Sequence, residues 1–204
     1  MTQFTKLGEL LADGRILRMK ALAAESITAS TVQRAVAAGL VEQVSRGVYR
    51  RAGAPHVPGI HLAEALVRIP NGIVCLLSAA EVHGFGDECS ARVWVAVPNK
   101  SHPARIDWPP VRYVRWRGDA PFRVGVSEQN VCGVRVRITD RARTVVDLLK
   151  MKATVGEEYA VGCLKGFASS GGTLADLLET ADALGLARRL SSLIKLAYIL
   201  AGVP

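Results

Sequence analysis

Long apolar runs are missing from this chain of 204 residues, although hydrophobic residues make up 50% of it. No stretch approaches the roughly 18 apolar residues that a bilayer-spanning helix needs, and the N-terminus lacks the pattern of a secretory signal. We therefore expect a cytoplasmic protein with no membrane partner. The apolar content is ample for a buried core.

Cysteine and histidine are scarce, with four of each. No two of them have the spacing of a zinc-binding pair, although His56 and His61 could meet around a linker. We expect reduced thiols in the core, and neither a metal nor a cofactor. The cysteines are Cys75, Cys89, Cys132 and Cys163, and the other two histidines are His83 and His102.

The motifs of common catalytic sites are missing as well. Two-metal nucleotidyl transfer needs closely placed carboxylates, and neither Asp-x-Asp nor Asp-x-Glu occurs. The chain also has no GxxxxGK[ST] loop, no GxSxG elbow and no Glu-x-Lys pair. We expect a protein that is not an enzyme.

Positive charge is what the chain has in excess, with 26 Lys and Arg against 18 Asp and Glu, a net charge of +8. Charge of this size favours an anionic partner, most often nucleic acid.

The segment 27–51, ITASTVQRAVAAGLVEQVSRGVYRR, predicts a short helix followed by a two-stranded hairpin. Thr28 or Ser30 would cap the helix, and Gly39 would end it. Apolar residues then alternate as in a strand, and Arg46 and Gly47 supply the turn.

Polar side chains at the start of this helix would face outward, where Gln suits adenine and Arg suits guanine in the major groove. These residues are Ser30, Thr31, Gln33 and Arg34. Arginines on or beside the hairpin would hold DNA phosphates, namely Arg46, Arg50 and Arg51. The segment therefore predicts binding to double-stranded DNA.

Two helices are expected upstream of this segment. Gly14 would end the first, whose apolar residues have helical spacing: Phe4, Leu7, Leu10 and Leu11. The second would run from about 16 to 24. Three helices and a hairpin are the inventory of a winged helix-turn-helix. The alternative is a small unit that packs against another part of the protein, with arginines that are only solvated.

Two prolines and two glycines in Ala52–Gly59 interrupt the pattern. We predict a winged helix-turn-helix domain at 1–52, a linker at 53–59 and an α+β domain at 60–204. The second domain would combine an antiparallel-type sheet with a C-terminal run of helices. Its expected helices cover 60–69, 139–150, 157–168, 173–184 and 186 or 187 to 200. The segment 73–85 would begin apolar and continue as a helix with Ser78 as cap, and the expected strands cover 92–97, 111–116, 122–126 and 134–138.

A second basic surface is expected in that domain. Arg115 and Arg117 would share one face of a strand, as would Arg135 and Arg137. If the two strands are neighbours, these four side chains line one sheet surface. A solvated face, a contact with DNA phosphates and a docking surface for an acidic partner all stay open.

The chain resembles the AbiEi antitoxins of type IV toxin-antitoxin systems over nearly its whole length. The resemblance rests on four strings in order: GVYRR at 47–51, LSAAEVHGF at 77–85, VWVAVP at 93–98 and TDRARTVVDLL at 139–149. It implies an N-terminal winged helix followed by an α+β antitoxin domain. Ala37 and Ala38 leave the later part of the recognition helix without polar side chains. Any contacts with bases would therefore come from residues 30–34.

The resemblance also implies an autorepressor that binds operator inverted repeats in its own promoter and opposes a nucleotidyltransferase-like toxin. Two copies would meet on the DNA, because one winged helix reads only a short site. The alternative is a winged-helix regulator with an effector-binding or dimerisation domain and no toxin partner. The product of the adjacent gene would discriminate between them.

Overall fold

The structure is a computed structural model, and it describes residues 2–85, 90–103 and 105–200. The chain divides into two compact units. Unit 1 comprises Met1–Asn71, Pro103–Pro110 and Gln129–Val136, and unit 2 comprises Gly72–His102, Val111–Glu128 and Arg137–Pro204. The domain boundary predicted at 53–59 stays a prediction.

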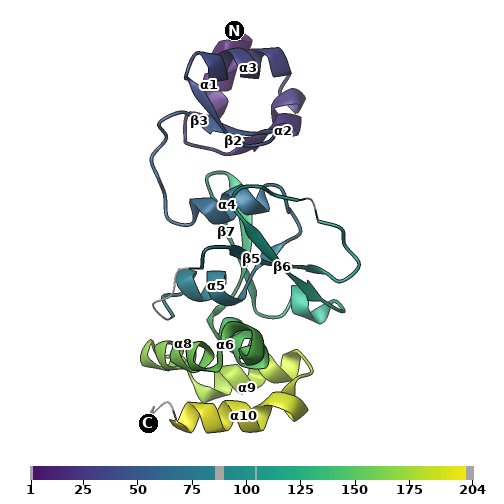
Figure 1. Cartoon of the computed structure of the whole chain (residues 1–204), viewed down its shortest axis with the longest axis vertical. Helices are drawn as coiled ribbons and strands as arrows, with labels where there is room; N and C mark the ends of the chain where they lie inside the picture. Colours follow the sequence, from purple (N-terminus) through teal and green to yellow (C-terminus); the bar gives the residue numbers. More distant parts are fainter. Residues whose placement is uncertain (1, 86–89, 104, 201–204) are drawn as a thin grey trace. The chain divides into compact units, whose positions relative to one another are not determined.

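Unit 1 contains three short helices, a three-stranded antiparallel sheet of order β1-β3-β2, and a fourth helix (Figure 1). The order along the chain is α1 (Gln3–Leu10), β1 (Leu17–Arg18), α2 (Met19–Ala24), α3 (Ala29–Ala37), β2 (Val41–Ser45), β3 (Val48–Arg51) and α4 (Ile60–Leu66). The predicted helices near residues 4–11 and 28–38 and the predicted hairpin are therefore present.

The second expected helix is shorter than predicted. Residues 17–18 form strand β1, which pairs with β3, and only Met19–Ala24 is helical.

A core of apolar side chains packs the helices of unit 1 against its sheet, and the burial of each Leu, Ile or Val contributes roughly 1.5–3 kcal/mol. The core consists of Leu7, Leu11, Leu22, Ile27, Val32, Ala35, Val41 and Tyr49.

Unit 2 is built on a mixed sheet of order β6-β5-β4-β8-β7. Strand β4 is antiparallel to β5 and parallel to β8, and β5 is parallel to β6. The strands are β4 (Ile73–Val74), β5 (Val93–Pro98), β6 (Val111–Trp116), β7 (Val126–Val131) and β8 (Val134–Thr139), and the tip of the β7–β8 hairpin belongs to unit 1. The predicted α+β class is confirmed, with both pairing directions in the sheet.

The helices of unit 2 form layers, with α6 and α8 between α5 on one side and α9 with α10 on the other (Figure 1). They are α5 (Leu76–Val82), the short 3-10 helix η1 (Ala120–Phe122), α6 (Arg141–Lys150), α7 (Lys152–Val155), α8 (Glu157–Ser169), α9 (Leu174–Ala183) and α10 (Ala187–Leu200). No helix of the described ranges has the length and apolar character to cross a bilayer.

Two local predictions in unit 2 were wrong. The strand expected at 122–126 is absent, because η1 ends there and the strand begins at Val126. Ser78 does not cap α5, whose N-cap is Cys75. Ser78 is buried instead, where its hydroxyl accepts a hydrogen bond from the Trp94 backbone N–H at 3.0 Å and so ties α5 to β5.

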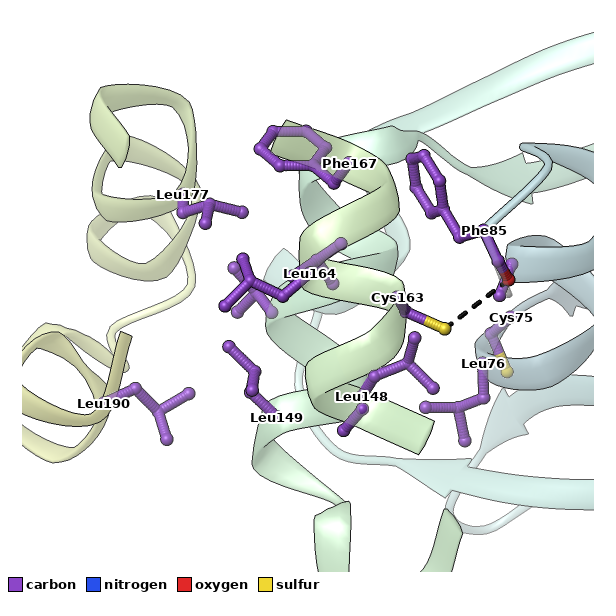
Figure 2. Close-up of a cluster of buried hydrophobic side chains, with 14 of the residues drawn as sticks. Cys75, Leu76, Phe85, Leu148, Leu149, Cys163, Leu164, Phe167, Leu177 and Leu190 are labelled. Carbon is purple, nitrogen blue, oxygen red and sulfur yellow. Dashed lines mark hydrogen bonds between the residues drawn. The ribbon is translucent and has the colours of Figure 1, made fainter. Parts of the chain in front are cut away.

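Figure 2 shows the core of unit 2, where α8, with Cys163, Leu164 and Phe167, lies between Leu177 of α9 on one side and Phe85, which follows α5, on the other. The Cys163 thiol donates to the Phe85 carbonyl at 3.5 Å, and Cys75 is also buried. The expectation of reduced core thiols is confirmed for these two residues. Cys132 is half-buried at the turn between β7 and β8, and Cys89 lies outside the described residues.

Candidate nucleic-acid interface

Helix α3 presents a polar face on its first two turns. Thr28 is the N-cap, and its hydroxyl accepts a hydrogen bond from the Thr31 backbone N–H at 3.3 Å. Ser30, Gln33 and Arg34 are exposed, and their spacing of three and four residues places them on one side of the helix. Three of the four residues predicted to face outward on this helix therefore do so.

Thr31 is the exception, because its side chain is buried. Its hydroxyl donates to the Gln3 side-chain carbonyl at 2.6 Å, and the Thr28 hydroxyl donates to the same oxygen at 3.1 Å. This network fixes the start of α3 to the start of α1. Thr31 thus positions the helix, and the expectation that it faces outward was wrong.

The turn between β2 and β3 carries an exposed cation. Arg46 and Gly47 form this turn, and Gly47 has a φ of +72°, which favours glycine. A register shift between Gln43 and Ser45 marks a bulge just before the turn. Arg46 is exposed at this end of the hairpin, as predicted.

Arg50 has a different environment from the one predicted. Its Nε donates to the Glu42 carboxylate, and its Nη1 lies 3.9 Å from Glu64 Oε1. Burial raises the pKa of Glu64, and the Arg50 charge opposes that increase. Since two carboxylates of unit 1 already surround this guanidinium, Arg50 is better suited to holding β3 to its neighbours than to holding a phosphate. Arg51 is exposed at the end of β3.

Arg18 is a basic residue of this region that the sequence pattern did not reveal. It pairs with Val48 across β1 and β3, and the Met19 backbone N–H donates to the Gly47 carbonyl at 2.9 Å. Arg18 is exposed and lies beside the turn that carries Arg46. A two-residue strand has no measurable alternation, so the pattern alone could not assign Arg18 to this sheet.

The four-arginine surface predicted for the second domain is not formed. Strands β6 and β8 are separated by β5 and β4, so Arg115 and Arg135 are not on neighbouring strands. Arg115 donates to the backbone carbonyls of Asn99 and Ser101 at 2.9 and 2.7 Å. The two strands are not neighbours, so the four arginines do not form a continuous basic face. Arg115, Arg117 and Arg135 are nevertheless exposed.

Arg137 is half-buried and already bound within the protein. Its Nη2 donates to the Phe122 carbonyl at 2.6 Å, and its Nε lies 3.6 Å from Glu128 Oε1.

Comparison with known proteins gives a family match for the segment that contains α3 and the hairpin. Residues 6–52 match the family described as "Transcriptional regulator, AbiEi antitoxin". This match supports a relation of the segment to antitoxin transcriptional regulators. No curated protein matches the chain.

The crystal structure of the RV2827C protein from Mycobacterium tuberculosis is similar in fold, with a TM-score of 0.62. The similarity covers 98% of this chain and 82% of that one at 13% sequence identity. At this identity the likeness concerns the fold alone.

Proposed function

We propose that the protein is a DNA-binding transcriptional regulator of the antitoxin class, and that residues 1–52 form its winged helix-turn-helix. The exposed face of α3, with Ser30, Gln33 and Arg34, is the observation that carries the proposal. Its position inside the segment that matches antitoxin regulators adds support. The net charge of +8 suits a DNA partner.

In the proposed complex, α3 enters the major groove with its first turns against base edges. Gln33 recognises adenine and Arg34 recognises guanine, since each side chain can form two hydrogen bonds to its base. Arg46 at the hairpin turn, Arg51 at the end of β3 and Arg18 beside the turn contact phosphates, which supplies salt-dependent affinity.

The regulator acts as an autorepressor on operator inverted repeats, and two copies occupy the two half-sites. It also opposes a nucleotidyltransferase-like toxin encoded beside it, and it has no catalytic activity of its own. Co-expression with the product of the adjacent gene tests the antitoxin role: growth should be restored by the full chain. Growth that stays arrested would contradict the antitoxin role and favour the alternative of a regulator without a toxin partner.

Operator binding is tested with the purified full chain, the DNA upstream of its own gene and a scrambled DNA of equal length, at two salt concentrations. Tight binding to the upstream DNA alone supports the proposal. Equal and weak binding to both DNAs that vanishes with salt would contradict it, because that is the behaviour of unspecific charge attraction.

Base recognition predicts that Gln33→Ala or Arg34→Ala lowers affinity for the operator by about 1–3 kcal/mol and leaves affinity for scrambled DNA nearly unchanged. Arg188→Ala is the control, since it removes an exposed cation from α10. Fluorescence anisotropy on both DNAs measures the difference. Equal losses on the two DNAs would show that these side chains do not read bases.

Phosphate contact predicts a different result for the hairpin turn. Arg46→Ala should weaken binding to both DNAs alike and reduce the slope of log affinity against log salt by about one. Arg50→Ala should leave that slope unchanged, because Glu42 and Glu64 already neutralise Arg50. A salt titration of the three proteins separates the two roles, and a slope that falls only in Arg50→Ala would reverse the assignment.

A further inference from the structure

A hollow in unit 2 opens where two parallel strands end. β5 and β6 are parallel and in register up to the pair Pro98 and Trp116, so the segments that follow them start at the same edge of the sheet (Figure 1). A cavity of about 680 Å³ lies there, lined by 98–100, 116–119, 122–123 and Arg137. Ligands of α/β sheets commonly bind outside the carboxyl ends of parallel strands, in cavities of this size.

Three exposed cations from three different segments border this hollow. Lys100 follows β5, Arg117 follows β6 and Arg123 follows η1. Within the ranges that the structure describes, none of the three forms an ion pair or a side-chain hydrogen bond, and Asp119 is the one carboxylate that lines the hollow with them. The side chains that line the hollow therefore carry an excess of positive charge.

The segment that carries Lys100 is held in place by hydrogen bonds. The Asn99 backbone N–H donates to the Trp116 carbonyl at 2.8 Å, and the Ser101 hydroxyl donates to the Pro98 carbonyl at 2.7 Å. Arg115 donates to the carbonyls of Asn99 and Ser101 from the neighbouring strand. Because these contacts fix the backbone on both sides of Lys100, little ordering of this segment is needed when an anion binds.

An aromatic pair supplies the apolar part of the hollow. The rings of Trp116 and Phe122 pack edge to face with centroids 5.4 Å apart, and Phe122 is half-buried. The Arg137 guanidinium is bound to the Phe122 carbonyl, which holds the backbone beside this ring. An exposed part of an aromatic ring next to three cations suits a ligand that joins a planar ring to phosphate groups.

We infer that this hollow binds a nucleoside phosphate, with the phosphates between Lys100, Arg117 and Arg123 and the base against Phe122. A small ligand fits better than a DNA backbone, because the cations surround a concave space on three separate segments. The inference does not depend on the proposed DNA binding of unit 1.

Isothermal titration calorimetry on the full chain tests the inference, with ATP, GTP, CTP, AMP, inorganic phosphate and tripolyphosphate as probes. We expect at least one nucleotide to bind more tightly than tripolyphosphate. Arg117→Ala and Arg123→Ala should each weaken it about tenfold or more, the scale of one charge-assisted hydrogen bond. Phe122→Leu should weaken the binding of nucleotides and leave the affinity for tripolyphosphate unchanged. Arg188→Ala, which removes an exposed cation from α10, should have no effect.

Four results would overturn the inference. One is the absence of binding by every nucleotide up to about 1 mM, the weak end of ligand affinity. Another is binding that Arg117→Ala, Arg123→Ala and Arg188→Ala change equally. Equal affinity for nucleotides and tripolyphosphate would leave an anion site without a base pocket. The last is a chain that binds no nucleotide, while Arg117→Ala and Arg123→Ala lower its affinity for DNA. That result would mean that these cations contact DNA.

Discussion

Replacement of Arg143 by alanine is expected to lower the free energy of unfolding by about 3–5 kcal/mol, the cost of breaking a buried ion pair. Arg143 and Asp147 are almost completely buried on α6, and Arg143 Nε donates to Asp147 Oδ2 at 2.8 Å. Nη1 donates to the carbonyls of Pro121 and Val124, and the guanidinium lies 4.5 Å from the centroid of the Trp116 ring. The variant would leave a buried carboxylate and two carbonyls without this donor.

The stability that Arg143→Ala loses should depend on pH, because the variant changes the pKa of Asp147. Burial raises the pKa of Asp147, and Arg143 opposes that increase. Without Arg143 the folded-state pKa rises further, so the folded state retains a proton that the unfolded state releases above its ordinary pKa of about 4. The loss of stability should therefore be largest near neutral pH and shrink as the pH falls toward about 4.

Urea titrations followed by tryptophan fluorescence measure this effect, because Trp94 and Trp116 are buried in unit 2. Arg188→Ala on the exposed side of α10 is the control and should change stability by no more than about 0.5 kcal/mol. A loss of similar size in both variants, or one that is independent of pH, would contradict the role given to the ion pair.

Replacement of Phe167 by alanine should cost about 3–5 kcal/mol, because it deletes a large buried ring. Phe167 is 2% exposed on α8, and its ring packs edge to face on Phe85 with centroids 6.0 Å apart (Figure 2). The Gly172 backbone lies close on another side: a Cβ at that position would be 2.3 Å from the ring. The ring thus holds the end of α5, α8 and the turn before α9 together.

The same urea titration compares Phe167→Ala with Leu196→Ala, whose side chain is 56% exposed on α10. The exposed leucine should cost no more than about 0.5 kcal/mol. A similarly small loss in Phe167→Ala would contradict the role given to the ring, because it would mean that the surrounding helices close the cavity left by the deleted side chain.

The long periodic helices were predictable from sequence because each repeats apolar residues on one face. α6 begins after Asp140, whose carboxylate accepts from the Arg143 backbone N–H at 2.8 Å, and the predicted helix at 139–150 differs by only two residues. β1 could not be predicted because two residues hold no period. β7 reads Ser-Glu-Gln-Asn between two valines, so its polar interior resembles a loop.

The candidate interface was predictable to the extent that it depends on local spacing. Gln33 and Arg34 follow from the helical period of α3. Thr31 was wrongly expected to face outward because its partner Gln3 lies 28 residues away. The ion pair of Arg50 with Glu64 was not foreseen because Glu64 lies on a separate helix. Side chains whose environment comes from distant segments are the ones that a local pattern cannot place.

The outer strand of the unit 2 sheet also affects how copies of the chain meet one another. β6 ends the strand order among the residues that the structure describes, so its outer edge faces no further strand of that sheet. Arg112 and Arg115 lie on opposite faces of β6, and Arg117 follows its end. A second copy that added its own β6 would bring the arginines of the two strands close to one another on both faces of the sheet. The like charges oppose this pairing, and the edge is therefore protected from aggregation by strand addition.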